Sequence, residues 1–319
     1  MLLWVIVCER LKRFMNDSMP FTPIILFVYN RCDHAIKTLE GLMKNPEFTE
    51  SPLYIYCDGP KQDMDIPAVQ AARDAIRARA LPNMVLVERE DNLGLGDSII
   101  KGVTEVCHKH GRAIVIEDDL LVSRHYLAYM NEALDRYANH DQVMQVVGHC
   151  FPAPGYGQSR GSSFLPFTSS WGWGTWKRAW QHFDPDLTGY DRAMADPGLR
   201  KKFNIDDAYS YTGMIAKLRR KGQLNRSWAV RWHWSVFKRN GLVLFPHRTL
   251  VLHFGDDDSG TNYRGRLAPV DIEFTTENAV VEFPGEIAVD KAFYAAVRRI
   301  IAKRQSLWSK GIRYLRRWL

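Results

Sequence analysis

Three consecutive acids follow a short apolar run, and their position makes them the residues of this chain best suited to chemistry. The run Ala113–Ile116 is rich in β-branched residues, and Glu117, Asp118 and Asp119 come directly after it. Like charges at the end of a buried strand repel one another, and the loss of water raises that cost. A divalent cation offsets both effects, because Mg²⁺ and Mn²⁺ take oxygen ligands and bridge carboxylates to phosphates. A solvated acidic strand end that caps the next helix explains the run equally well.

Two further polar residues come at the ends of earlier apolar runs. Arg31 follows Ile24–Tyr29 and has the planar, two-pronged group that pairs with phosphate. Asp58 follows Leu53–Cys57 and has the oxygens to accept hydrogen bonds from a nucleobase or a ribose. Taken singly, a surface salt bridge and a turn aspartate explain these two residues as well. The segment Asp91–Gly96 resembles a phosphate loop only weakly, since it lacks the lysine of a P-loop and the third glycine of a dinucleotide fingerprint.

The first half of the chain alternates between two spacings of apolar residues. Short β-branched runs predict strands at Ile24–Tyr29, Leu53–Cys57, Met84–Glu88, Ala113–Ile116 and Val143–Val147. Apolar residues three or four apart predict helices at His34–Met43, Ala68–Ala80, Ser98–His108 and Tyr126–Tyr137. This alternation predicts an α/β fold with a mainly parallel sheet. Ligands bind beyond the carboxyl ends of such strands, so Arg31, Asp58 and the three acids are expected to share one site.

The pattern changes after about residue 150. Residues 152–163 are rich in Gly, Pro and Ser and predict a loop, and residues 184–226 read as a polar helical insertion. Tryptophans cluster on both sides of this insertion, around residues 171–180 and 228–234. Two more strands are predicted at Leu242–Phe245 and Thr249–Leu252.

The bulk composition excludes several classes of protein. The 319 residues are 46% hydrophobic and 25% charged, as in a soluble globular chain. No apolar run reaches the roughly 20 residues that span a bilayer. The net charge of +7 is smaller than the nine Lys and Arg residues of 291–319, so the remainder is slightly acidic and is not expected to bind nucleic acid. The five cysteines form no CxxC pair, which favours reduced thiols over a disulfide framework or a zinc site.

Taken in order, these segments resemble the GT-A-fold glycosyltransferases. The order is Tyr29-Asn30-Arg31, Cys57-Asp58-Gly59, Asp91–Gly96, Glu117-Asp118-Asp119 and Trp171-Gly172-Trp173-Gly174. The likeness covers about residues 20–260 and is greatest to the N-acetylglucosaminyltransferase I type and to bacterial family 2-like sugar transferases. It implies a three-layer α/β/α sandwich that moves a sugar from a nucleotide-sugar donor, expected to be a UDP-sugar, onto an acceptor hydroxyl. A divalent cation (Mn²⁺ or Mg²⁺) and inversion of the anomeric centre belong to the same expectation.

The resemblance also implies roles for individual residues. Arg31 and Asp58 are expected to contact the nucleotide, with Glu117 and Asp118 facing the donor ribose and sugar. Asp119 is expected to bind the cation that bridges the donor diphosphate. Four tryptophans are expected to contact the sugars, whose apolar faces stack on indole rings, although burial in the core accounts for about half of these residues equally well. They are Trp171, Trp173, Trp228 and Trp232.

One departure from the resembling enzymes concerns the general base. Those enzymes have an aspartate beside a tryptophan in the later aromatic segment, where this chain reads Arg226–Trp232 without an acid. The available carboxylates are in the insertion and in the loop that follows His253. We expect Asp257, or else Asp207, to remove the proton of the acceptor hydroxyl. The loop around Asp257 can also be interpreted as a flexible lid only, and His253 as a further contact to the cation or phosphate.

The basic C-terminal segment has apolar residues at helix spacing. It predicts an amphipathic helix that adsorbs to an anionic membrane surface through residues 291–319. The alternative is a helix packed on the domain with a solvated basic face. The expected organisation is an N-terminal extension (1–19), a nucleotide-sugar-binding half (20–150), an acceptor-binding half of the same domain (151–289) and the helical tail (290–319).

These features together predict a cytoplasmic glycosyltransferase, of hexosyl or N-acetylhexosaminyl type, held on the inner face of the membrane. Its acceptor is expected to be a glycan or a lipid-linked glycan in surface polysaccharide synthesis. Two alternatives stay open. A nucleotidyltransferase shares a nucleotide-binding core with metal-bound acids, but it would favour a Gly-rich segment with a lysine near the first strand, which is absent. A non-catalytic, membrane-associated sugar-binding protein is kept open by the missing acid near Trp228.

Overall fold

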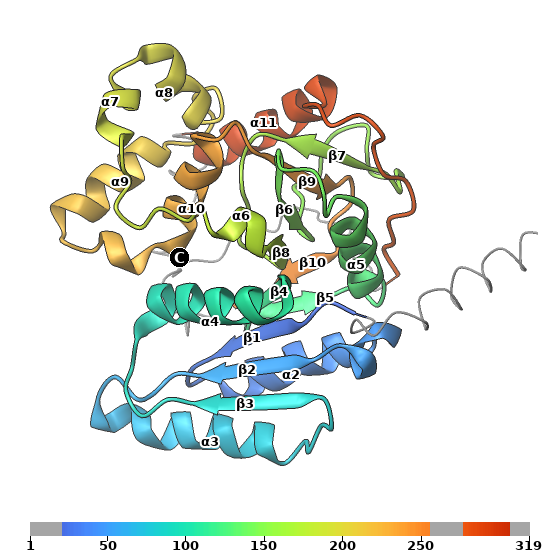
Figure 1. The fold of residues 1–319 in the computed structure, drawn as a ribbon, viewed down its shortest axis with the longest axis vertical. Helices are drawn as coiled ribbons and strands as arrows, with labels where there is room; N and C mark the ends of the chain where they lie inside the picture. Colours follow the sequence, from blue (N-terminus) through green and yellow to red (C-terminus); the bar gives the residue numbers. More distant parts are fainter. Residues whose placement is uncertain (1–20, 256–276, 307–319) are drawn as a thin grey trace, which may run out of the picture.

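The computed structural model describes residues 21–255 and 277–306 of the chain. Its centre is an eight-stranded sheet with the order β3-β2-β1-β4-β8-β6-β9-β7 (Figure 1). The strands are β1 (Ile24–Val28), β2 (Leu53–Cys57), β3 (Met84–Glu88), β4 (Arg112–Glu117), β6 (Val143–Val147), β7 (Ser162–Leu165), β8 (Trp173–Trp176) and β9 (Leu242–Pro246). Only β8 and β7 run antiparallel to their neighbours. The prediction of an α/β fold with a mainly parallel central sheet is confirmed.

Helices cover both faces of this sheet. The first half supplies α2 (Cys32–Met43), α3 (Ile66–Arg77), α4 (Gly94–His110) and α5 (Tyr126–Arg136). Helix α2 packs on α3, and both α2 and α5 contact the short helix η1 (Pro46–Glu50), whereas α4 packs on β1 and β4. Figure 1 shows α4 in front of the strands and α2 behind them. The three-layer arrangement therefore agrees with the prediction.

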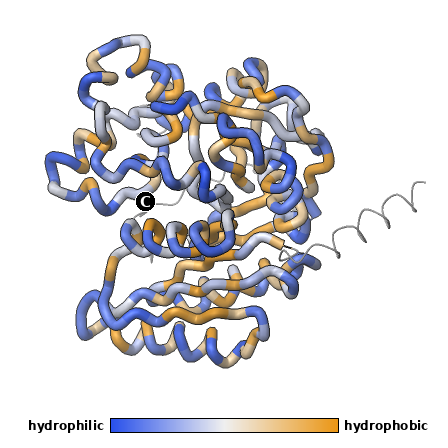
Figure 2. Tube along the Cα trace, in the orientation of Figure 1, coloured by the Kyte–Doolittle hydropathy of each residue, from blue (hydrophilic) through white to orange (hydrophobic). Residues whose placement is uncertain are grey.

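The central strands of the sheet are buried because they are mainly apolar on both faces. Every residue of β1, β2 and β6 is buried, as expected for parallel strands covered by helices. Figure 2 shows these central strands as mainly hydrophobic, with hydrophilic residues concentrated on the outer helices. Gly102 lets α4 approach closely, since a Cβ there would lie 2.8 Å from the ring of Phe27. The cysteines Cys32, Cys57, Cys107 and Cys150 are free thiols.

The second half of the chain adds an insertion and a small second sheet. The insertion consists of α7 (Tyr190–Met194), α8 (Pro197–Phe203), α9 (Tyr211–Arg220) and η3 (Leu224–Arg226), followed by α10 (Trp228–Phe237). This confirms the predicted helical insertion, which has a hydrophobic cluster of its own. Strand β5 (Leu120–Val122) pairs with β10 (Val251–His253), and α6 (Lys177–Trp180) follows β8. The predicted loop 152–163 is wrong at its end, because Ser162 and Ser163 pair with β9 and belong to β7.

The last described helix, α11 (Lys291–Gln305), packs on the main core. Its apolar side chains Phe293, Val297 and Ile301 are buried there, at 0%, 0% and 5% exposure. The predicted helix is confirmed over this range, but these three residues are not available for insertion into a membrane. The rest of the predicted tail and the extension 1–19 lie outside the described residues. Within the described ranges, no helix is both long enough and apolar enough to cross a bilayer.

Candidate active site

The polar residues predicted to share a site do meet at one edge of the sheet. Strand β1 pairs in parallel with β2 and with β4, and the registers Val28↔Cys57 and Phe27↔Glu117 bring their carboxyl ends level. The chain continues from β1 outward through β2 and β3, and then returns to the other side of β1 as β4. Ligands bind at such a switch in strand order, because the loops diverge there and leave a crevice.

Arg31 joins the loops that follow β1 and β4. Its Nη2 donates to Oδ1 of Asp118 and, at 2.9 Å, to Oδ2 of Asp119. Its other terminal nitrogen, Nη1, is buried and has no hydrogen-bond partner among the described residues. A buried guanidinium nitrogen without a partner is costly, whereas phosphate and carboxylate groups satisfy it well.

The three acids differ in their titration. Burial raises the pKa of Glu117 to about 8, and the charges of Asp119 and Asp118 add to the effect. Burial also raises the pKa of Asp118 to about 6, even though Arg31 opposes this change. Burial acts on Asp119 in the same direction, but His253 and Arg31 outweigh it and hold its pKa below the ordinary value. Asp119 is therefore the acid best kept ionised, as a cation ligand must be.

The segment after β10 closes the other side of Asp119. His253 Nε2 lies 3.3 Å from Asp119 Oδ2, and the backbone N–H of Phe254 donates to the Asp119 carbonyl at 3.0 Å. A Cβ on Gly255 would lie 2.9 Å from Asp119 Oδ2 and 3.1 Å from Arg31 Nη1. A larger residue at this position would therefore displace the Asp119 side chain. A carboxylate oxygen and an imidazole nitrogen side by side fit Mn²⁺, which accepts both kinds of ligand. Among the described residues, however, no group of three or more His, Cys, Asp or Glu side chains is placed to hold an ion.

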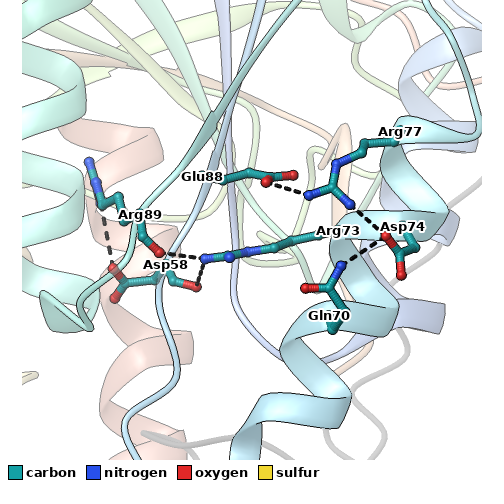
Figure 3. A network of polar contacts seen from close by, with 7 residues as sticks. All are labelled: Asp58, Gln70, Arg73, Asp74, Arg77, Glu88 and Arg89. Atoms are coloured by element: carbon teal, nitrogen blue, oxygen red, sulfur yellow. Dashed lines mark hydrogen bonds and ion pairs between the residues drawn. The ribbon is translucent and has the colours of Figure 1, made fainter.

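Asp58 organises a neighbouring loop. Its two carboxylate oxygens accept the backbone N–H groups of Leu93 and Gly94 at 3.0 and 2.9 Å. Arg73 reaches the main-chain oxygens of Asp58 and Arg89 at 3.3 and 2.5 Å, as Figure 3 shows. The Asp58 carboxylate therefore fixes the loop at the start of α4, and its contact with a nucleotide stays a prediction.

Only one of the four predicted sugar-binding tryptophans lies at the site. Trp171 is half-buried, and its ring stacks on His253 with centroids 4.9 Å apart. Trp173, Trp228 and Trp232 are 0%, 3% and 0% exposed, and Trp173 stacks on Trp228 at 4.9 Å. A buried indole has no free face for a sugar, so the prediction of sugar contact is wrong for these three residues. They pack α10 against the sheet.

Neither predicted general base is placed at the site by the described structure. Asp257 lies outside the described residues. Asp207 is exposed in the insertion, in a turn where Ile205, Asp206 and Asp207 all have positive φ, and it makes no hydrogen bond or ion pair with a described residue. Its catalytic role stays a prediction that no contact supports.

Two residues of the site gave little or no signal in the sequence. His149 lies edge-on to Trp171, with ring centroids 4.4 Å apart, but its position after β6 is not marked by any motif. Gly255 is recognisable only as a glycine before three consecutive aspartates, and its role follows from the approach of β10 to the acids. The antiparallel pairing of β5 with β10 causes that approach, and it is a long-range contact.

Comparisons with known proteins give distant likenesses only. No protein-family model and no curated protein matches the chain. It is similar to the mannosyltransferase PcManGT from Pyrobaculum calidifontis in complex with GDP-Man and Mn²⁺, with a TM-score of 0.37 and 13% identity over 74% of this chain and 81% of that one. It is also similar to GalNAc-T7 with UDP, GalNAc and Mn²⁺, with a TM-score of 0.45 and 10% identity over 81% of this chain and 47% of that one. Function must therefore be argued from the geometry of the site.

Proposed function

We propose that this chain is a cation-dependent glycosyltransferase that moves a sugar from a nucleotide-sugar donor onto the hydroxyl of a glycan or lipid-linked glycan. One observation supports this most directly. Asp119 stands at the switch in strand order with His253 on one side and Arg31 on the other, and Arg31 Nη1 is buried without a partner among the described residues. A cation and a diphosphate together would satisfy this arrangement, since the cation needs the carboxylate and the phosphates need the guanidinium.

Each residue of the site has a part in the proposed reaction. Asp119 and His253 would hold the cation, Arg31 would bind a phosphate oxygen, and the loop fixed by Asp58 would border the nucleotide. When bound, the cation supplies stabilisation of the charge that develops on the departing nucleoside diphosphate. We infer a single displacement with inversion, with the proton of the acceptor hydroxyl going to a carboxylate. UDP-sugars are the donors to test first, and both hexosyl and N-acetylhexosaminyl donors belong in the panel.

The substitution Asp119→Asn tests this function. The loss of a partner that only supports a metal ligand costs about 10- to 100-fold, so the loss of the ligand itself should cost roughly 100-fold or more. Mn²⁺ affinity and Mn²⁺-dependent release of nucleoside diphosphate from a panel of nucleotide sugars should both fall, and Asp33→Asn, an exposed acid on α2, should leave both unchanged. Unaltered ion affinity and turnover in Asp119→Asn would refute the proposal. Pyrophosphate release from a sugar phosphate and a nucleoside triphosphate would identify a nucleotidyltransferase instead.

We also propose that the basic C-terminal segment holds the enzyme on an anionic membrane surface on the cytoplasmic side. In the described part, α11 keeps its apolar side chains in the core and exposes cations, so electrostatic attraction would have to hold it there. Four cations are exposed on α11, and each contributes about 1 kcal/mol near such a surface. They are Lys291, Arg298, Arg299 and Lys303.

Changing these four residues to Gln should release the protein from vesicles of phosphatidylcholine and phosphatidylglycerol in a flotation assay. The matched control changes four exposed cations of the insertion to Gln: Lys201, Lys202, Lys217 and Arg220. Equal vesicle binding by the wild type and the α11 variant would contradict a role for the described part of the segment.

A further inference from the structure

A cavity of about 300 Å³ adjoins the candidate cation site. Trp171 and His149 line it, together with Tyr209, Tyr211 and Met214 of the insertion. Trp171 also belongs to the candidate cation site, because it stacks on His253, whose Nε2 lies 3.3 Å from Asp119 Oδ2. The ring of Trp171 therefore lies between the cavity and His253, which is proposed to hold the cation together with Asp119.

The cavity carries no formal charge on its described lining. None of the described residues that line it is Asp, Glu, Lys or Arg. His149 is 2% exposed, and burial, with a smaller effect of the Arg304 charge, lowers its pKa to about 3, so its ring is neutral at physiological pH. Burial raises the pKa of Tyr209 and Tyr211, which are neutral as well. Arg304 is not among the lining residues, and its guanidinium carbon lies 4.9 Å from the ring centroid of Phe151. A carboxylate or phosphate that entered would therefore lose water without forming an ion pair with any described lining residue.

The lining combines aromatic faces with small hydroxyl groups. Trp171, Tyr209 and Tyr211 supply rings, and Ser169, Ser170 and Ser227 supply oxygens. The volume is at the lower end of the roughly 300–1,000 Å³ typical of small-molecule sites, which suits one or two sugar rings. A pyranose has apolar faces for the rings and hydroxyl edges for the oxygens.

His149 adds a second sign of a missing ligand. Its Nε2 is buried and has no hydrogen-bond partner among the described residues. Buried polar atoms of side chains are nearly always paired, so one without a partner beside a cavity needs an explanation. A ligand hydroxyl can supply that partner, because hydroxyl groups both donate and accept.

We propose that this cavity holds the acceptor, and that the acceptor ring it takes is an uncharged pyranose rather than an acidic or phosphorylated sugar. This inference depends on the proposed function only in identifying the bound sugar as the acceptor of the reaction. The choice of an uncharged ring follows from the lining. Trp171 would place the ring beside the cation site, and the insertion helices would decide which sugars fit.

Binding measured without any donor tests this inference. Wild-type protein is titrated with the methyl glycosides of glucose, galactose, mannose and N-acetylglucosamine, and with the glucuronide and the glucoside 6-phosphate, using ligand-observed NMR. At least one neutral glycoside should bind, and the charged analogues should bind at least about tenfold more weakly. Equal affinity for charged and neutral rings, or no binding of any neutral glycoside, would overturn the proposal.

Two substitutions locate the binding in the cavity. Ala229→Phe and Met214→Trp each add a ring to the lining and should weaken the neutral glycoside about tenfold or more. Ala216→Phe, at an exposed position of α9, should not. Urea unfolding midpoints equal to that of the wild type would show that these variants are folded. Full retention of glycoside affinity in both lining variants would refute the location, and loss of uridine or UMP binding in its place would assign the cavity to the donor base.

A third substitution tests the charge argument directly. Met214→Lys places a cation in the lining and should raise affinity for the glucuronide about tenfold. An unchanged ratio of glucuronide to glucoside affinity would show that charge does not set the specificity. Because no donor is present, a protein that binds neutral glycosides in the cavity and yet releases no nucleoside diphosphate would refute the transferase and leave the specificity of the cavity standing.

Discussion

Arg31 has a geometry that lysine cannot reproduce. One terminal nitrogen contacts both Asp118 and Asp119, and the other is left for a group absent from the described residues. The planar guanidinium holds these directions at once, whereas an ammonium is a single point of charge on a flexible stem. The arrangement therefore links the acids and the expected phosphate through one side chain.

The substitution Arg31→Lys should weaken binding of a nucleoside diphosphate by about tenfold, since a charged hydrogen bond contributes about 1.5–3 kcal/mol. Isothermal titration in the presence of Mn²⁺ measures this affinity. Arg79→Lys is the matched control, because Arg79 forms only an exposed ion pair with Glu40 at 2.8 Å. If Arg31→Lys bound the diphosphate as tightly as the wild type, Arg31 would have no role in holding phosphate.

At the scale of elements, the loop before α4 is positioned by packing as well as by hydrogen bonds. The Asp58 carboxylate holds the backbone of Leu93 and Gly94, and Gly59 lies directly against the same loop. A Cβ on Gly59 would be 2.3 Å from the carbonyl oxygen of Glu90 and 2.6 Å from the carbonyl carbon of Asp91. Both contacts are with backbone, which cannot turn aside as a side chain can.

Gly59→Ala should therefore lower the free energy of unfolding by about 1–3 kcal/mol, the usual cost of overpacking. Urea unfolding measures the change. Gly157→Ala is the control, since nothing lies within 4 Å of the Cβ it would add, and it should be neutral or slightly stabilising. Equal stability of Gly59→Ala and the wild type would mean that the loop moves without cost and is not held as described.

At the scale of the whole molecule, the insertion joins the sheet domain through buried aromatic residues and a neutral histidine. His233 of α10 is 1% exposed, stacks on Phe203 at 4.7 Å and lies 4.0 Å from Tyr211, centroid to centroid. Burial lowers its pKa to about 4, although a hydrogen bond to the Phe203 carbonyl opposes this change. Protonation of His233 is thus coupled to unfolding of the region.

The sign of the resulting pH dependence of stability follows from the pKa of His233 in the unfolded and folded states. The unfolded chain binds a proton at His233 near pH 6.5, and the folded chain does so only near pH 4. Stability is complete above pH 6.5 and falls as the pH drops toward 4, by up to about 1.4 kcal/mol per pH unit for one proton. Urea unfolding at pH 7, 6 and 5 should show this slope, and His233→Gln should reduce it. His108→Gln, at an exposed position of α4, should not; an equal slope in His233→Gln and the wild type would contradict this origin.

Much of the sheet could be predicted from the sequence alone, because local patterns specify local structure. Three strands have the predicted bounds: Leu53–Cys57, Met84–Glu88 and Val143–Val147. Short apolar runs rich in β-branched residues, placed between helix-period segments, seldom form any other structure. The meeting of Arg31 with Asp118 and Asp119 also followed from sequence, because parallel strands bring their carboxyl ends to one edge. The specific likeness to the N-acetylglucosaminyltransferase I type stays a prediction.

Tertiary structure decided what the local pattern leaves open. A tryptophan has the same sequence signal whether it faces a ligand or the core, and only packing separated Trp171 from Trp173 and Trp232. His253 and Gly255 reach Asp119 through the pairing of β10 with β5, which are more than a hundred residues apart in the chain. The cavity likewise forms between distant segments, since Trp171 and residues of the insertion line it together. Contacts of this kind depend on which distant segments pack together, and no periodicity within one segment contains that information.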